Sequence, residues 1–118
     1  MATILVVDDA AFMRMRCCKM LTEQGYDVLQ AENGAQAVDV YREKRPDAVL
    51  MDITMPEMDG LAALKALRAL DPEARVAMVT AVGQQTIIMD AIKSGARDFV
   101  VKPFEAARVL QAVSKLLA

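Results

Sequence analysis

The chain contains no histidine. This absence excludes a histidine general base, a Cys2His2 zinc site and a phosphohistidine carrier. The two cysteines, Cys17 and Cys18, are adjacent, and on a helix their side chains would point about 100° apart. We therefore expect two free thiols in a reducing cytosol rather than a disulfide.

Long apolar runs and an excess of positive charge are also missing. No stretch approaches the ~18 apolar residues that a membrane span needs, and the N-terminal residues lack the basic segment of a secretory signal. The net charge of −2 argues against a nucleic-acid surface that depends on bulk charge. We expect a cytoplasmic protein that binds neither membranes nor nucleic acid.

The composition is that of an ordinary globular protein, with 55% hydrophobic and 25% charged residues. The length of 118 residues suits one domain with one modest core. We see no linker, repeat or low-complexity segment, and we expect residues 1–118 to form a single domain with no separate output domain.

Short apolar runs alternate with amphipathic segments along the whole chain. The runs are bounded by turn residues and are too short for helices, so they predict strands over residues 3–8, 26–31, 47–52, 75–80 and 98–102. Helices are expected over residues 10–24, 35–44, 60–70, 84–94 and 105–117. This alternation predicts an α/β fold, a doubly wound parallel sheet of five strands with helices on both faces.

Apolar side chains spaced by three and four mark the inner faces of the helices. The predicted inner faces are Ala10, Met13, Cys17, Met20 and Leu21 in the first helix and Ile87, Ile88, Ala91 and Ile92 in the fourth. Asp59 is expected to cap the third helix.

Polar residues stand at the ends of the predicted strands. The first strand ends in Asp8-Asp9, the third in Asp52, the fourth in Thr80 and the fifth in Lys102. Because the carboxyl ends of parallel strands meet at one edge of a sheet, we expect these side chains to converge there.

Three carboxylates brought together repel one another, and a hard divalent cation relieves that repulsion. With oxygen ligands and room for water, Mg²⁺ is the natural candidate. Asp52 would then be the nucleophile that accepts a phosphoryl group. The metal and Lys102 would balance charge on the transferred oxygens, and Thr80 would offer them a hydroxyl.

The motifs around these residues resemble the receiver domain of two-component response regulators over the whole chain, and most closely its CheY-type chemotaxis branch. The matching stretches are Ile4–Asp9, Met51–Pro56, Met58–Gly60, Val79–Ala81 and Val101–Phe104. Two further stretches, Ala10–Arg14 and Gly83–Gln85, look like the chemotaxis regulators that work with CheC/CheX-type phosphatases.

The resemblance implies the flavodoxin-like sheet order 2-1-3-4-5, which is known from CheY. It implies phosphorylation of Asp52 and Mg²⁺ held directly by Asp9, Asp52 and the backbone carbonyl of Thr54, with Asp8 acting through water. It also implies that Lys102 contacts the phosphoryl group, commonly with a cis bond after it, before Pro103.

The resemblance further implies a conformational switch. Thr80 would move toward the phosphoryl oxygens, and Phe99 would turn inward and reshape the face made by the fourth helix, the fifth strand and the fifth helix. Many chemotaxis regulators have Tyr at the position of Phe99, so here the packing half of the switch would operate without a hydroxyl contact. Plain core packing is the alternative role of Phe99.

In function, the resemblance implies a monomeric switch protein with no enzymatic activity beyond its own phosphorylation and dephosphorylation. A CheA-like sensor histidine kinase would phosphorylate it, and a flagellar motor switch protein would bind it. A phosphorelay shuttle and the receiver fragment of a larger regulator stay open as alternatives.

Two other functional classes fit the residues less well. A phosphatase with an aspartate nucleophile, of the haloacid dehalogenase kind, starts from Asp-x-Asp, whereas Thr54 stands two residues after Asp52. A flavodoxin-like cofactor carrier needs a Ser/Thr/Gly-rich loop after the first strand, whereas Asp8 and Asp9 would repel a phosphate without a metal.

Overall fold

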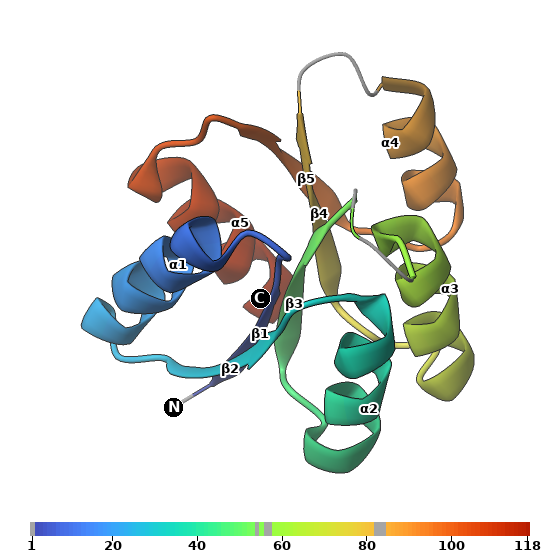
Figure 1. Cartoon of the computed structure of the whole chain (residues 1–118), viewed down its shortest axis with the longest axis horizontal. Coiled ribbons are helices and arrows are strands. Elements are labelled where there is room, and N and C mark those ends of the chain that lie inside the picture. Colours follow the sequence, from blue (N-terminus) through green and yellow to red (C-terminus); the bar gives the residue numbers. More distant parts are fainter. Residues whose placement is uncertain (1, 54, 56–57, 82–84) are drawn as a thin grey trace.

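The computed structural model describes residues 2–53, 55, 58–81 and 85–118. In this part of the chain five strands alternate with five helices (Figure 1). The strands are β1 (Thr3–Val7), β2 (Asp27–Ala31), β3 (Ala48–Asp52), β4 (Val76–Ala81) and β5 (Asp98–Lys102). The helices are α1 (Ala11–Glu23), α2 (Gly34–Lys44), α3 (Gly60–Leu70), α4 (Gln85–Lys93) and α5 (Ala106–Leu117).

The strands form one parallel sheet in the order β2-β1-β3-β4-β5, which confirms the predicted order. β3 lies at its centre, and every residue of β3 is buried. A continuous apolar run is what a strand covered on both faces requires. The strand that ends in Asp52 is therefore the most enclosed element of the sheet.

The helices cover both faces of the sheet: α1 and α5 lie on one side, and α2, α3 and α4 on the other (Figure 1). Alternate residues of the strands supply two separate core layers, as the two-residue repeat of a strand dictates. Leu5, Val49, Met51 and Met78 face the α2–α4 side, whereas Ile4, Leu50, Val79 and Val100 face α1 and α5.

The predicted elements are confirmed, with boundaries that differ by at most one residue at each end. The cap at α3 is also confirmed, because Asp59 Oδ1 accepts a hydrogen bond of 2.9 Å from the backbone N–H of Ala62. Two inner-face predictions are wrong. Ala10 is exposed because it precedes α1 instead of lying in its first turn. Ile92 is 49% exposed because α4 turns Ala91 toward its neighbours α3 and β4.

Cys17 and Cys18 are both free thiols, as their adjacent positions predicted. Burial, with a smaller contribution from the Asp8 carboxylate, raises the pKa of Cys17 to about 11, so this thiol stays protonated. Among the described helices, none combines the length and apolarity of a bilayer span.

The connection from β3 to α3 depends on a glycine. The backbone N–H of Gly60 donates a hydrogen bond of 2.7 Å to the carbonyl of Ile53, which holds the start of α3 against the end of β3. A Cβ atom on Gly60 would overlap the carbonyl oxygen of Asp52 and crowd the Cα of Ile53. Backbone atoms cannot move aside as a flexible side chain does, so only glycine fits.

We predict that Gly60→Ala lowers the free energy of unfolding by about 2 kcal/mol or more, because it overpacks the backbone at the end of β3. Urea unfolding of the parent and the variant measures the change. Ala69→Ser, at an exposed position of the same helix, is the control and should change stability by less than about 0.5 kcal/mol. Equal stability of Gly60→Ala and the parent would contradict this account of the connection.

Candidate functional site

Three carboxylates meet at the carboxyl edge of the sheet. Asp8 directly follows β1 and Asp52 ends β3, and these two strands are neighbours in parallel register. With Asp9 they form a group in which one carboxylate oxygen from each residue lies within 4.8 Å of the others. Asp8 and Asp52 are 6% and 7% exposed, whereas Asp9 is open to solvent. The predicted convergence of these three residues is confirmed.

Asp8 is held by contacts on every side. Its backbone N–H donates to the carbonyl of Ala31 in β2 at 3.2 Å. Its Oδ1 accepts from the backbone N–H of Ala10 at 2.9 Å, and its Oδ2 lies 3.2 Å from Nζ of Lys102. The carboxylate therefore has little freedom to move away from Asp52.

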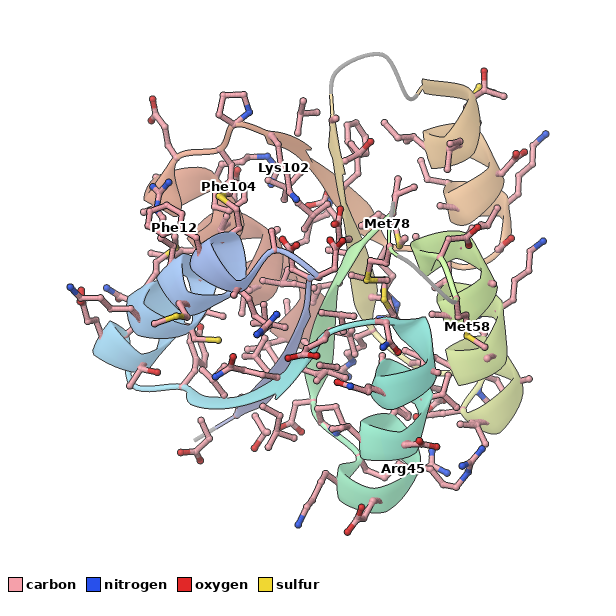
Figure 2. The ribbon with its side chains drawn as sticks, in the orientation of Figure 1. Phe12, Arg45, Met58, Met78, Lys102 and Phe104 are labelled. Atoms are coloured by element: carbon pink, nitrogen blue, oxygen red, sulfur yellow. The ribbon has the colours of Figure 1, made fainter. Side chains whose placement is uncertain are left out.

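Lys102 reaches the acidic group from the end of β5, on the same side of the molecule as Phe104 and Phe12 (Figure 2). Its Nζ lies 3.2 Å from Asp8 Oδ2 and 3.5 Å from Asp52 Oδ1. Burial opposes its positive charge, but the two carboxylates outweigh that effect and raise the pKa of Lys102. The peptide bond between Lys102 and Pro103 is cis, as the motif implied.

The charges at this edge are not balanced. Burial raises the pKa of Asp52 to about 6; Lys102 opposes the shift, and the Asp8 and Asp9 carboxylates add to it. One ammonium group thus faces three carboxylates. An all-oxygen group with one member exposed to water suits a hard divalent cation. Asp8, Asp9 and Asp52 can hold such a metal.

Thr80 and Phe99 lie on the neighbouring strands β4 and β5. Thr80 is fully buried in β4, one residue beyond Val79, which pairs with Asp52. Its hydroxyl donates a hydrogen bond of 3.2 Å to the carbonyl of Ala81. Phe99 in β5 is partly buried and packs against the core under α2–α4. The Thr54 carbonyl, which the family resemblance implied as a metal ligand, lies outside the described residues.

One residue of this region was not assigned any role from the sequence. The guanidinium of Arg14 in α1 donates from Nη1 to the backbone carbonyl of Asp8 at 2.7 Å. Its partner is a main-chain atom, which no residue pattern records, and an arginine in the first turns of a helix is ordinarily solvent-facing. The sequence places Gly60 at the start of a helix and in a family motif, but it does not show why glycine is needed there, since the atoms it must avoid are backbone atoms of Asp52 and Ile53.

Comparison with known families gives a match to the response regulator receiver domain over residues 4–114. The chain belongs to the response regulator receiver family. Receiver relatives cover nearly the whole chain. The chemotaxis protein CheY of Bacillus subtilis is 57% identical over 115 residues, which are 97% of this chain and 96% of that protein. CheY of Thermotoga maritima is 50% identical over 96% of this chain and 95% of its own length.

A solved receiver structure has the same architecture. The CheX–CheY–BeF₃–Mg²⁺ complex from Borrelia burgdorferi contains a chain that superimposes with a TM-score of 0.94 at 35% identity, covering 99% of this chain and 90% of that one. That structure was solved with Mg²⁺.

The match to the family and the identity with CheY decide between the functional classes raised by the sequence. The chain is a CheY-like chemotaxis response regulator, and its Asp8, Asp9 and Asp52 group is typical of the family's phosphoacceptor pocket. It is a phosphoacceptor signalling protein rather than a classical enzyme.

The raised pKa of Asp52 makes the stability of the metal-free receiver depend on pH. The folded protein binds this proton more tightly than the unfolded chain, whose pKa is near 3.8. Protonated Asp52 therefore adds roughly 2–3 kcal/mol to the free energy of unfolding. This contribution is complete below pH 4 and is lost as the pH rises through about 6.

We predict that Asp52→Asn is more stable than the parent at pH 7.5 in the presence of a chelator, and that this advantage shrinks between pH 6 and pH 4. Urea unfolding at a series of pH values measures both proteins. Asp90→Asn, at an exposed position of α4, is the control and should show no such trend. A difference between parent and Asp52→Asn that is the same at every pH would contradict the assignment.

Proposed function

We propose that Asp52 accepts a phosphoryl group from the phosphohistidine of a CheA-like sensor kinase, in a reaction that requires Mg²⁺. Residues 1–118 then act as one receiver domain. The observation that carries this proposal is the position of Asp52, buried within a group of three carboxylates, with Lys102 Nζ 3.5 Å from its Oδ1. A lone buried carboxylate would be a poor acceptor, since nothing would neutralise the incoming oxygens.

Asp9 and Asp52 would bind the metal directly, together with the backbone carbonyl of Thr54, and Asp8 would act through water. When bound, Mg²⁺ would offset the negative charge of both the carboxylates and the transferred group. Asp9 is the exposed member of the group, so it leaves the site open to water and to the donor. The Borrelia complex, which contains Mg²⁺, supports this choice of ion.

Lys102 and Thr80 would complete the site. The ammonium of Lys102 now lies against both Asp8 and Asp52, so it needs only a short displacement to reach a phosphoryl oxygen on Asp52. The Thr80 hydroxyl, which donates to the carbonyl of Ala81, would turn to donate to a phosphoryl oxygen instead. Both residues would respond directly to phosphorylation.

The output would be the face formed by α4, β5 and α5, with Phe99 as its switch. Three apolar side chains lie exposed on α4 and β5, namely Met89, Ile92 and Val101, at 59%, 49% and 37%. An apolar surface next to a phosphorylation-sensitive strand suits a protein partner. We propose a flagellar motor switch protein as that partner, because the closely similar relatives are chemotaxis proteins.

Further partners and the cellular setting follow from the same relationship. A CheC/CheX-type phosphatase would remove the phosphoryl group, in keeping with the CheX complex of the Borrelia relative. We propose a cytoplasmic monomer that binds neither nucleic acid nor membrane. The two free thiols support a reducing compartment.

We predict that acetyl phosphate with Mg²⁺ adds a single phosphoryl group to the parent protein, because Asp52 is the one acceptor. Intact mass spectrometry detects the adduct. The adduct should be lost in Asp52→Ala and in the presence of a chelator. Asp27→Asn, at the opposite end of the sheet, is the control and should be phosphorylated like the parent. An adduct that persists in Asp52→Ala or without Mg²⁺ would refute the proposal.

We predict that Phe99→Ala is phosphorylated normally but that its phosphorylated form binds the motor switch protein about tenfold more weakly, a loss of about 1.4 kcal/mol. The physical reason is that the truncated side chain cannot transmit inward packing to α4. Surface plasmon resonance with the beryllofluoride-treated proteins measures the affinity. Phe12→Ala removes an aromatic ring that is 72% exposed on α1 and should leave the affinity unchanged. Equal affinities of Phe99→Ala and the parent would assign Phe99 to core packing alone.

A further inference from the structure

Arg14 is enclosed next to the acidic group. Its side chain is only 11% exposed, and its guanidinium makes three separate contacts. Nη1 donates to the backbone carbonyl of Asp8 at 2.7 Å, and Nε donates to Gln30 Oε1 at 3.0 Å. Nη2 lies 3.7 Å from Glu32 Oε1. The planar guanidinium therefore joins α1, the loop after β1 and the end of β2 in one fixed arrangement.

These contacts fix the peptide group that connects Asp8 to Asp9. The Asp8 carbonyl belongs to this peptide, and its acceptor position is taken by Arg14. The backbone N–H of Asp8 belongs to the preceding peptide, between Val7 and Asp8, and donates to the carbonyl of Ala31. The peptide groups on both sides of Asp8 are thus held, and Arg14 holds the one that leads into Asp9.

Asp9 has no comparable support of its own. It is exposed, and among residues 2–53, 55, 58–81 and 85–118 no hydrogen bond or ion pair to its side chain is found. Its carboxylate nevertheless lies within 4.8 Å of those of Asp8 and Asp52. The direction of the backbone before Asp9 is what keeps it there.

We infer that Arg14 is a positioning residue for cation binding, which holds the Asp8–Asp9 peptide so that the Asp9 carboxylate stays in the acidic group. Gln30 aims the guanidinium by accepting from Nε. The inference rests on the proposed function in one respect, namely that the bound cation is Mg²⁺.

If only the positive charge of Arg14 mattered, the expected effect on Mg²⁺ affinity would have the opposite sign. A guanidinium close to three carboxylates repels a divalent cation, so its removal would strengthen Mg²⁺ binding if Arg14 acted only through its field. If Arg14 acts through the hydrogen bond to the Asp8 carbonyl, its removal weakens binding although a positive charge is lost. The sign of the effect separates the two roles.

The test is isothermal titration calorimetry, which measures the affinity for Mg²⁺ of the unphosphorylated parent and of the variants Arg14→Met, Arg14→Lys and Gln30→Ala. We expect Arg14→Met to bind Mg²⁺ about tenfold more weakly than the parent, as is typical when the residue that orients a ligand is removed. Arg14→Lys keeps the charge and one donor and should fall between them. Arg16→Met removes the same charge from an exposed position of the same helix and should bind at least as tightly as the parent.

Gln30→Ala tests the path of the effect. It should weaken Mg²⁺ binding in the parent but cause no further loss in the Arg14→Met background, because the two residues act through one hydrogen-bonded unit. Thermal unfolding of each variant confirms that it is folded at the titration temperature. Should Arg14→Met not fold, Arg14→Lys and Gln30→Ala carry the same comparison with the charge retained.

The positioning role would be overturned if Arg14→Met bound Mg²⁺ as tightly as the parent or more tightly. Where that variant does not fold, it would be overturned if both Arg14→Lys and Gln30→Ala bound Mg²⁺ with the affinity of the parent. Failure of the proposed function has a different signature: the parent itself would then bind no Mg²⁺, or would bind it equally well after Asp52→Asn.

Discussion

Three carboxylates and one ammonium group share the carboxyl edge of the sheet, and this imbalance of charge is the constraint on which the site depends. Burial makes the imbalance costly, as the raised pKa of Asp52 records. A divalent cation would relieve it, and the proposed phosphoryl group would add negative charge that the cation and Lys102 would then offset. In this view, metal binding and phosphorylation both act on the same balance of charge around Asp52.

The fold supports this arrangement through its topology and through contacts made by the backbone. The parallel order β2-β1-β3-β4-β5 brings Asp8, Asp52 and Lys102 to one edge, although they are spread along most of the chain. Asp52 ends the central strand, where every residue is buried, whereas Lys102 ends the edge strand β5 and is partly exposed. Gly60 lets α3 begin directly against the Asp52 backbone, and Arg14 fixes the Asp8–Asp9 peptide.

Most of the fold and the principal acidic residues could be predicted from the sequence, because both depend on the type and spacing of the side chains. Strand-length apolar runs and helical spacing predict the elements, and the parallel arrangement then places the polar strand ends together. The roles of Gly60 and Arg14 could not be predicted, because each depends on a contact with main-chain atoms near the acidic group, which composition and spacing do not record. Ile92 was misplaced because helical periodicity defines an apolar side but not how much of that side the sheet covers. The same incomplete coverage of α4 leaves Ile92 and Met89 exposed on the proposed output face, where Val101 of β5 is also exposed.

The most direct test of the charge account is a calorimetric titration of beryllofluoride, a phosphoryl mimic, into the protein at a series of Mg²⁺ concentrations. If cation and anion adjust one charge balance at Asp52, each must strengthen the binding of the other by the same factor. The account predicts that the beryllofluoride affinity rises steadily with Mg²⁺ until the cation site is full, and that Asp52→Asn abolishes binding. A beryllofluoride affinity that is independent of Mg²⁺, or one that survives in Asp52→Asn, would contradict it.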